Sequence, residues 1–302
     1  MKIFNKTAIA LALVLGASSS VYASPMQLDL SSFGGNQHDA GRFIGTADAN
    51  SSTATFTEFG FSQMLATSAY DMTDGSLLGS FYDTNIPAEL AALGVPTSGI
   101  AMDGVTTVNL ASPLCAAGGG QCDIDALSPI VPPLASDNEG FLQTWDLQVA
   151  YHFDGTLTAA GPSYTGGTFE VFFNSFLDDN LDALAFSGTL TGSTLSAANL
   201  DLFFDITFAA DNFLNIWNGS SWVDAHDAIA AGDVPTLALD TNVNPPIPTL
   251  DQLLLVGDSA IRQTTLDGSV TANIPEPASI ALFGLGLLGF GAASRKRKAA
   301  QA

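Results

Sequence analysis

The best candidate for metal binding is the acidic segment that contains Asp178, Asn180 and Asp182. At this alternating spacing the side-chain oxygens can gather on one turn, and hard oxygen ligands are what Ca²⁺ prefers. The segment differs from an EF-hand loop, because Ala183 stands in place of the loop glycine and Thr189 in place of the bidentate glutamate. Two interpretations stay open, a Ca²⁺ site and a solvated turn between strands, and we expect no other cofactor.

Motifs for catalysis are missing from the sequence. His38, His152 and His226 lie in separate segments, belong to no zinc or nucleophile motif, and are expected to be solvent-facing polar residues. No G-x-S-x-G sequence is present, so a serine hydrolase elbow has no support. Pairs of carboxylates are frequent, but a chain with 30 acidic residues produces them by chance. We therefore expect a protein that is not an enzyme.

The three tryptophans are candidates for stacking on sugar rings. Trp145 falls at a position that predicts burial in the core. Trp217 and Trp222 flank a predicted turn at Asn218-Gly219 and stay open as a sugar-binding surface.

Short β-strands must position these residues. Trp145 to Phe153 alternates apolar with polar side chains, which is typical of a strand with one buried face. Asp154-Gly155 predicts a hairpin turn directly after it. Alternate residues from Leu200 to Phe208 are expected to share another buried face. Short strands with frequent turn residues favour an all-β fold, an antiparallel β-sandwich of jelly-roll type.

Two further features organise the body of the chain. A short helix is predicted from Asp224 to Ala231, with Asp224 as its N-terminal cap and Gly232 at its end. The proline-rich passage at residues 128–134 is the best internal boundary, and a long surface connection within one sandwich is the alternative.

The N-terminus has the pattern of a secretory signal peptide, residues 1–23. Lys2 and Lys6 precede a short apolar stretch, and a small-residue cleavage site places Ala23 before Ser24. We therefore expect export through the Sec translocon and cleavage by signal peptidase. A signal helix of this length is too short to stay as a permanent anchor.

The exported body, residues 24–274, is strongly acidic. Of the 8 basic residues only Arg42 and Arg262 lie in it, together with 29 of the 30 acidic residues, so its net charge is −27. Nucleic acids and anionic lipids bind to cationic surfaces, which excludes nucleic acid as a partner of this domain. Because the body also has regular apolar patterns, we expect it to fold.

The only two cysteines, Cys115 and Cys122, lie in the part of the chain that is expected to be exported. Thiols oxidise in that environment, so a disulfide that closes the short loop between them is expected.

The C-terminal residues 275–298 form a separate segment. Pro275-Glu276-Pro277 precedes an apolar run at 278–293, and the cations Arg295, Lys296, Arg297 and Lys298 follow it. A helix of 16 residues spans about 24 Å, less than the roughly 30 Å of a hydrocarbon core, so it would be a marginal transmembrane helix. The cations predict that its end is cytoplasmic and that the body lies outside. A G-x-G-x-x-G match in the run is rejected as a dinucleotide site, because no βαβ unit surrounds it.

This order of features resembles the PEP-CTERM sorting domain of bacterial exported proteins, and the body is loosely similar to PEP-CTERM proteins of the flocculation-associated kind. The resemblance implies recognition by the membrane protease exosortase near Pro275, Glu276 and Pro277. It also implies a Gram-negative-type envelope, a transient stay in the inner membrane, and delivery to the cell surface or extracellular matrix.

The function that we expect is that of a non-enzymatic surface or matrix protein associated with exopolysaccharide, in biofilm or floc formation. One alternative is a carbohydrate-binding module that depends on Ca²⁺. A second alternative is an extracellular hydrolase.

Overall fold

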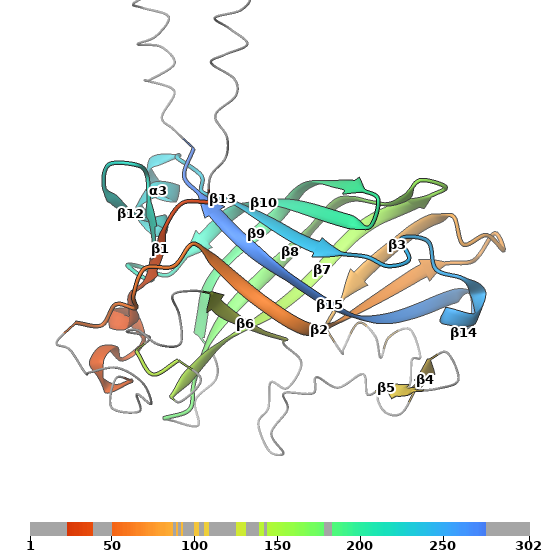
Figure 1. Ribbon diagram of the computed structural model, residues 1–302, viewed down its shortest axis with the longest axis horizontal. Coiled ribbons are helices and arrows are strands. Elements are labelled where there is room, and N and C mark those ends of the chain that lie inside the picture. Colours follow the sequence, from red (N-terminus) through yellow and green to blue (C-terminus); the bar gives the residue numbers. More distant parts are fainter. Residues whose placement is uncertain are drawn as a thin grey trace, which may run out of the picture.

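The computed structural model describes residues 23–38, 50–86, 89, 92, 100–102, 106–108, 125–130, 139–141, 144–177 and 183–275. Strands dominate these residues (Figure 1). The strands are β1 Met26–Leu28, β2 Glu58–Asp71, β3 Gly79–Thr84, β4 Ile100–Met102, β5 Thr106–Val108, β6 Asp125–Ile130, β7 Trp145–Thr158, β8 Gly161–Ser175, β9 Ala183–Ser196, β10 Asn199–Ala209, β11 Leu214–Trp217, β12 Trp222–Asp224, β13 Thr236–Asn242, β14 Leu254–Val256 and β15 Ser259–Asn273. The helical elements are α3 Ala225–Ala231 and the 3-10 turns η1 Leu30–Phe33, η2 Gly35–Gln37 and η4 Leu250–Gln252.

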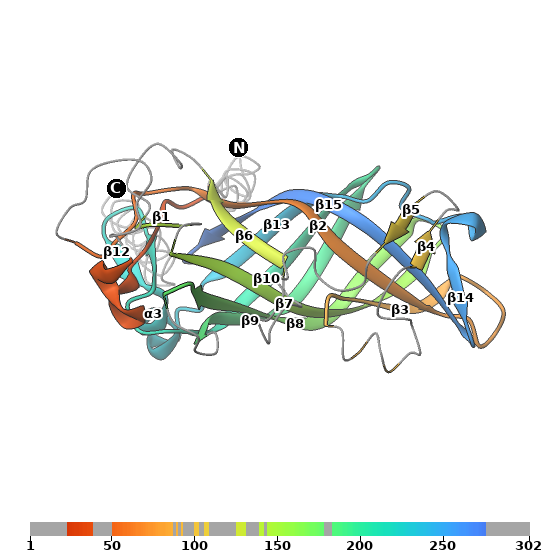
Figure 2. The ribbon, with the colours of Figure 1, turned by 90° about the horizontal axis from the view of Figure 1, so that it is seen from below.

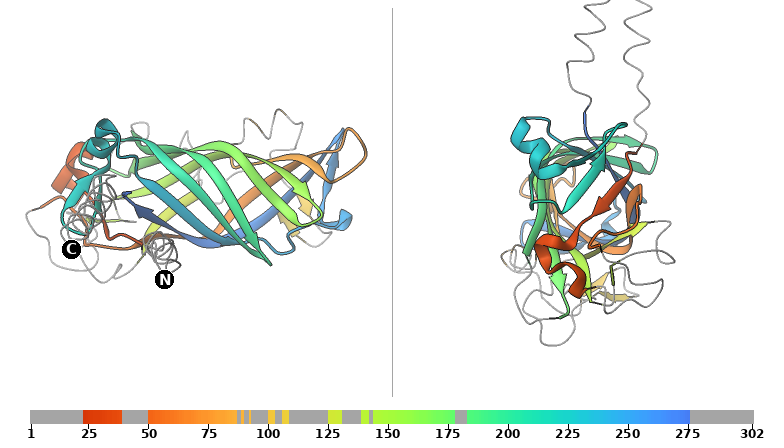
Figure 3. Two further views of the ribbon diagram at one scale, coloured as in Figure 1. Left: turned by 90° about the horizontal axis from the view of Figure 1, so that it is seen from above. Right: turned by 90° about the vertical axis from the view of Figure 1, so that its left-hand side faces the viewer.

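The main sheet is antiparallel and curls until it pairs with itself. Strands β2, β3, β7, β8, β9, β10, β13 and β15 follow one another through hydrogen-bonded pairs, and β15 pairs back onto β2. Strand β6 pairs with both β2 and β7, while β14 extends from β15. Figures 2 and 3 show the long, tilted strands of this curled sheet from two sides. The predicted all-β antiparallel fold is confirmed, and one continuous sheet supplies the facing walls of its core.

Strand β7 shows how the sequence builds the inner face. Its side chains alternate between buried and partly exposed positions from Trp145 to Phe153, as predicted. The predicted hairpin at Asp154-Gly155 is wrong, because both residues lie inside β7, where the pairing with β8 has a bulge. The turn comes later, at residues 159–160. A Cβ at Gly155 would lie 2.6 Å from the ring of Phe81, so glycine is needed there for packing rather than for a turn.

A second bulge changes the face of β10. Leu200, Leu202, Phe204 and Ile206 are buried as expected, but Phe208 is 41% exposed. The register between β10 and β9 shifts between Ile206 and Phe208, which turns the later side chain away from the core. The prediction that Phe208 shares the buried face is therefore wrong.

A small sheet covers one end of the curled sheet. Strand β11 pairs with β1 on one side and with β12 on the other. Helix α3 follows β12, and the Asp224 side chain caps it by accepting a hydrogen bond from the His226 N–H. Gly232, at φ 86°, ends the helix in the left-handed region. The predicted short helix is thus confirmed together with both of its caps.

Within the part of the chain that the structure describes, no helix combines the length and the apolar composition that crossing a membrane requires.

Candidate functional site

The two ends of the described body lie side by side. The Ser24 N–H donates a hydrogen bond of 3.0 Å to the Ala272 carbonyl, and the Ser24 hydroxyl donates one of 3.0 Å to Asn273 Oδ1. Asn273 ends β15, and Pro275 follows two residues later in an exposed position. The predicted signal cleavage site and the first residue of the predicted sorting motif, Pro275, therefore lie close together on the surface.

The β11–β12 hairpin lies next to this place. The backbone N–H of Trp217 donates a 2.8 Å hydrogen bond to the carbonyl of Pro25, the residue after Ser24. Trp217 pairs across the hairpin with Trp222, and their rings meet edge to face with centroids 5.6 Å apart. Trp222 is 39% exposed, whereas Trp145 is fully buried, as its position in the sequence predicted. Figures 1 and 2 place β12, β1 and the end of β15 toward the same end of the molecule.

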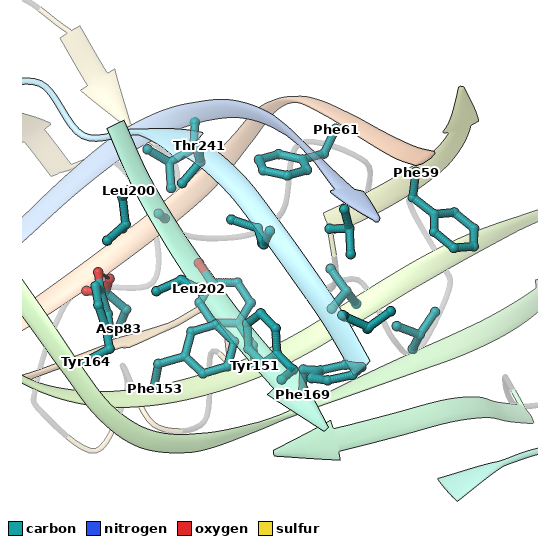
Figure 4. Close-up of a pocket in the computed structure, with 18 of the residues that line it drawn as sticks. Phe59, Phe61, Asp83, Tyr151, Phe153, Tyr164, Phe169, Leu200, Leu202 and Thr241 are labelled. Atoms are coloured by element: carbon teal, nitrogen blue, oxygen red, sulfur yellow. Dashed lines mark hydrogen bonds between the residues drawn. The ribbon is translucent and has the colours of Figure 1, made fainter. Parts of the chain in front are cut away.

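The interior of the curled sheet contains a narrow apolar cavity (Figure 4). Its volume is about 90 Å³, well below the roughly 300–1,000 Å³ of ordinary ligand pockets. Its lining is almost wholly aliphatic and aromatic, and Figure 4 shows Phe153, Tyr151 and Phe169 on one side of it. The size and lining fit an imperfectly packed core better than a binding pocket.

One buried carboxyl group borders this cavity. Asp83 is 7% exposed, and its Oδ2 accepts a hydrogen bond from the Tyr164 hydroxyl (Figure 4). Burial raises the pKa of Asp83 to about 6, although Ser68, Tyr164 and the Arg262 charge oppose this rise. The pKa of Tyr164 is also raised, first by burial and then by the charge of Asp83.

Arg262 is the cation that faces this group. It is 4% exposed, and it lies across from Ser68, which in turn lies across from Asp83 on the next strand. Its guanidinium donates to the carbonyls of Pro245 and Asn244, at 3.0 and 3.2 Å. Arg262 thus lies beside the buried Asp83 and also binds residues 244–245, which follow β13.

The buried pair of charged residues, Asp83 and Arg262, was not predicted from the sequence. Asp83 follows Phe81 by two residues and therefore shares its face of β3, which was the available signal. Arg262 is one of only two cations in the acidic body, and this scarcity was a second signal.

His152 forms a separate polar cluster on the outer face of β7. Its Nδ1 lies 2.8 Å from Glu89 Oε2, its Nε2 lies 3.4 Å from Asp154 Oδ1, and its ring stacks on Tyr82. Burial alone would lower the pKa of His152, but the hydrogen bonds and charges of Glu89 and Asp154 outweigh this and raise it. The raised pKa favours the protonated imidazole of His152, and this alone indicates no reaction.

The rings of the other two histidines each contact a backbone carbonyl. His38 is fully buried, not solvent-facing as expected, and its Nε2 forms a 2.8 Å hydrogen bond with the Phe33 carbonyl. His226 is exposed, and its Nδ1 lies 3.0 Å from the Ala209 carbonyl. The three histidines therefore do not form a common site.

Several predicted site residues lie outside the described residues. They are Cys115, Cys122, Asp178, Asn180, Asp182, Glu276, Pro277, Arg295, Lys296, Arg297 and Lys298. The disulfide and the Ca²⁺ site accordingly stay predictions. Within the ranges that the structure does describe, no group of three or more His, Cys, Asp or Glu side chains is arranged to hold a metal ion.

Together, the curled all-β body and its adjoining ends define an acidic β domain with a terminal segment attached directly to its last strand. Residues 273–298 match the family model of the PEP-CTERM protein-sorting motif. No curated protein and no solved structure matches the chain. The chain is therefore a PEP-CTERM domain-containing protein, as the resemblance implied.

The sorting motif indicates how the protein is exported and processed. A PEP-CTERM segment indicates an exported protein that is sorted and processed by exosortase. Such a protein is held transiently at the membrane before its release to the cell surface. The match begins at Asn273, the last residue of β15, so no linker separates the sorting segment from the folded body.

Proposed function

We propose that this protein is a non-enzymatic component of the cell surface or extracellular matrix, where it associates with exopolysaccharide and supports biofilm or floc cohesion. The observation that carries the proposal is the sorting motif at 273–298, which follows directly on an acidic β body. The expected signal peptide at 1–23 agrees with export.

The charge of the body suggests how it would act in a matrix. With a net charge of −27 it repels copies of itself and anionic polysaccharide, so that cohesion at low salt is disfavoured. Divalent cations can bridge carboxylates on the protein and on the polysaccharide, because both offer the oxygen ligands that Ca²⁺ prefers. We therefore expect retention in the matrix to depend on divalent cations even if the body has no ordered Ca²⁺ site.

Deletion of residues 275–302 tests this proposal. The truncated protein keeps β15 whole, so the body should fold while exosortase loses its recognition segment. We expect the truncated protein to leave the matrix fraction for the culture medium and the cells to clump less. A matched control exchanges exposed Asp233 for Asn in the full-length chain, which leaves the segment intact. Unchanged matrix retention and clumping after the deletion would refute the proposal.

A further inference from the structure

We propose that the β11–β12 hairpin inserts Trp217 and Trp222 into the headgroup layer of the membrane while the sorting segment holds the protein there. This inference rests on the transient anchoring that the sorting motif indicates, and it does not depend on the proposed role in the matrix. The occupant of this surface is a lipid bilayer.

The chain leaves little room between the body and the lipid. Pro275 is the last described residue, and the apolar run begins three residues later at Ala278. Three residues reach at most about 11 Å when fully extended. The headgroup region on each side of a bilayer is about 5–8 Å thick. The surface around Pro275 must therefore lie at or close to the headgroups whenever the apolar run is in the membrane.

The hairpin is fixed to that surface by backbone hydrogen bonds. Ser24 bonds to Ala272, three residues before Pro275, and the next residue, Pro25, accepts from the Trp217 N–H. Strand β1 then continues the pairing with β11, where Met26 lies opposite Ile216. Since these are strand contacts rather than a flexible tether, the hairpin approaches the membrane together with the end of β15. Figure 3 shows this end of the molecule face on.

The chemistry of the hairpin suits the headgroup layer. Its tip, residues 217–222, carries no charge in a domain with a net charge of −27. The Asn218 side chain accepts hydrogen bonds from the N–H groups of Ser220 and Ser221, which forms a compact turn between the two tryptophans. Trp222 is 39% exposed, and indole rings are enriched at membrane interfaces because one part is apolar and the N–H is polar.

Nearby carboxylates determine which lipid surface fits. Asp224 ends β12 and Asp227 lies in the first turn of α3, so a strongly anionic bilayer would repel this end of the body. Zwitterionic lipid lacks that repulsion. The test therefore uses vesicles of zwitterionic phosphatidylcholine.

Quenching of tryptophan fluorescence by brominated lipid tests the inference. The signal-processed chain, residues 24–302, is incorporated into these vesicles, with bromine placed near the headgroups or deep in the acyl chains. We expect a loss of fluorescence that is largest with shallow bromine. The double variant W217F/W222F retains only buried Trp145 and should lose this quenching, while W222F alone should lose a large part of it.

Flotation of the vesicles separates failure of anchoring from failure of the inference. All variants should float with the vesicles, because the sorting segment is unchanged. Floating protein whose quenching equals that of W217F/W222F would overturn the inference. It would also be overturned if exopolysaccharide, and not lipid, altered the emission of Trp217 and Trp222, since the hairpin would then be a sugar-binding surface.

Discussion

The substitution Asp83→Asn tests whether the interior carries a destabilising charge. Asp83 is buried, borders an apolar cavity and accepts a hydrogen bond from Tyr164, while the charge of Arg262 opposes the rise of its pKa. Asparagine has nearly the same shape and can still accept from Tyr164, but it carries no charge at any pH. The variant therefore removes the titration and keeps most of the packing.

The raised pKa of Asp83 fixes the sign and size of the effect. Its pKa is about 6 in the folded protein, against an ordinary value of 3.8. The folded state therefore holds this proton more tightly, so its contribution to stability is complete below about pH 4 and is lost as the pH rises through 6. At 1.36 kcal/mol per pKa unit, the full contribution is about 3 kcal/mol, and about 2.4 kcal/mol of it is lost between pH 4 and pH 7.

The assay is thermal or denaturant unfolding of the body, residues 24–274, in the wild type and the variant from pH 4 to pH 7.5. Many other carboxylates titrate in this range, so the informative quantity is the difference between the two proteins. We expect the stability of the variant relative to the wild type to rise by about 2.4 kcal/mol across this range, a shift in Tm of roughly 5–10 °C. The exposed control Asp233→Asn should follow the wild type. If the stability of Asp83→Asn and of the wild type changed in parallel with pH, the Asp83 charge would not be what destabilises the folded protein.

Two further substitutions probe packing and charge. Gly188→Ala should lower the free energy of unfolding by roughly 1–3 kcal/mol, because its Cβ would lie 2.3 Å from the Asp205 carbonyl oxygen. In the same strand, a Cβ at Gly192 would meet nothing within 4 Å, so Gly192→Ala should be nearly neutral in chemical unfolding. Equal losses would contradict the crowding at Gly188. Arg262→Met should cost roughly 1–3 kcal/mol through the buried carbonyls of Asn244 and Pro245 that lose their donor, and the cost should be larger at pH 7 than at pH 4, where Asp83 is protonated. A loss independent of pH would show that Arg262 acts only through its hydrogen bonds to Asn244 and Pro245.

Local patterns were enough where short-range physics decides the structure. The alternation from Trp145 to Phe153 predicts which side chains are buried, because successive residues of a strand face opposite sides of the sheet. The caps of α3 follow from Asp224 and Gly232, since both act through the nearest backbone groups. The sorting segment is also local, as its motif, apolar run and cations are contiguous in the chain.

Predictions failed where a residue's environment comes from a distant strand. Asp154-Gly155 matches a turn sequence, but the Phe81 ring above Gly155 makes the glycine part of a strand. Phe208 leaves the core because the pairing with β9 slips by one position. Neither neighbour can be identified from the local sequence.

The all-β class, the acidic composition and the sorting segment follow from the sequence alone, since each depends on composition or on adjacent residues. Three further features depend on the fold: β15 closes onto β2, Asp83 and Arg262 share the interior, and Ser24 lies beside Ala272. A two-residue alternation requires one buried face but does not say which strand lies across from it. Strand pairing and closure set that choice, and they bring together residues nearly 250 positions apart, such as Ser24 and Asn273.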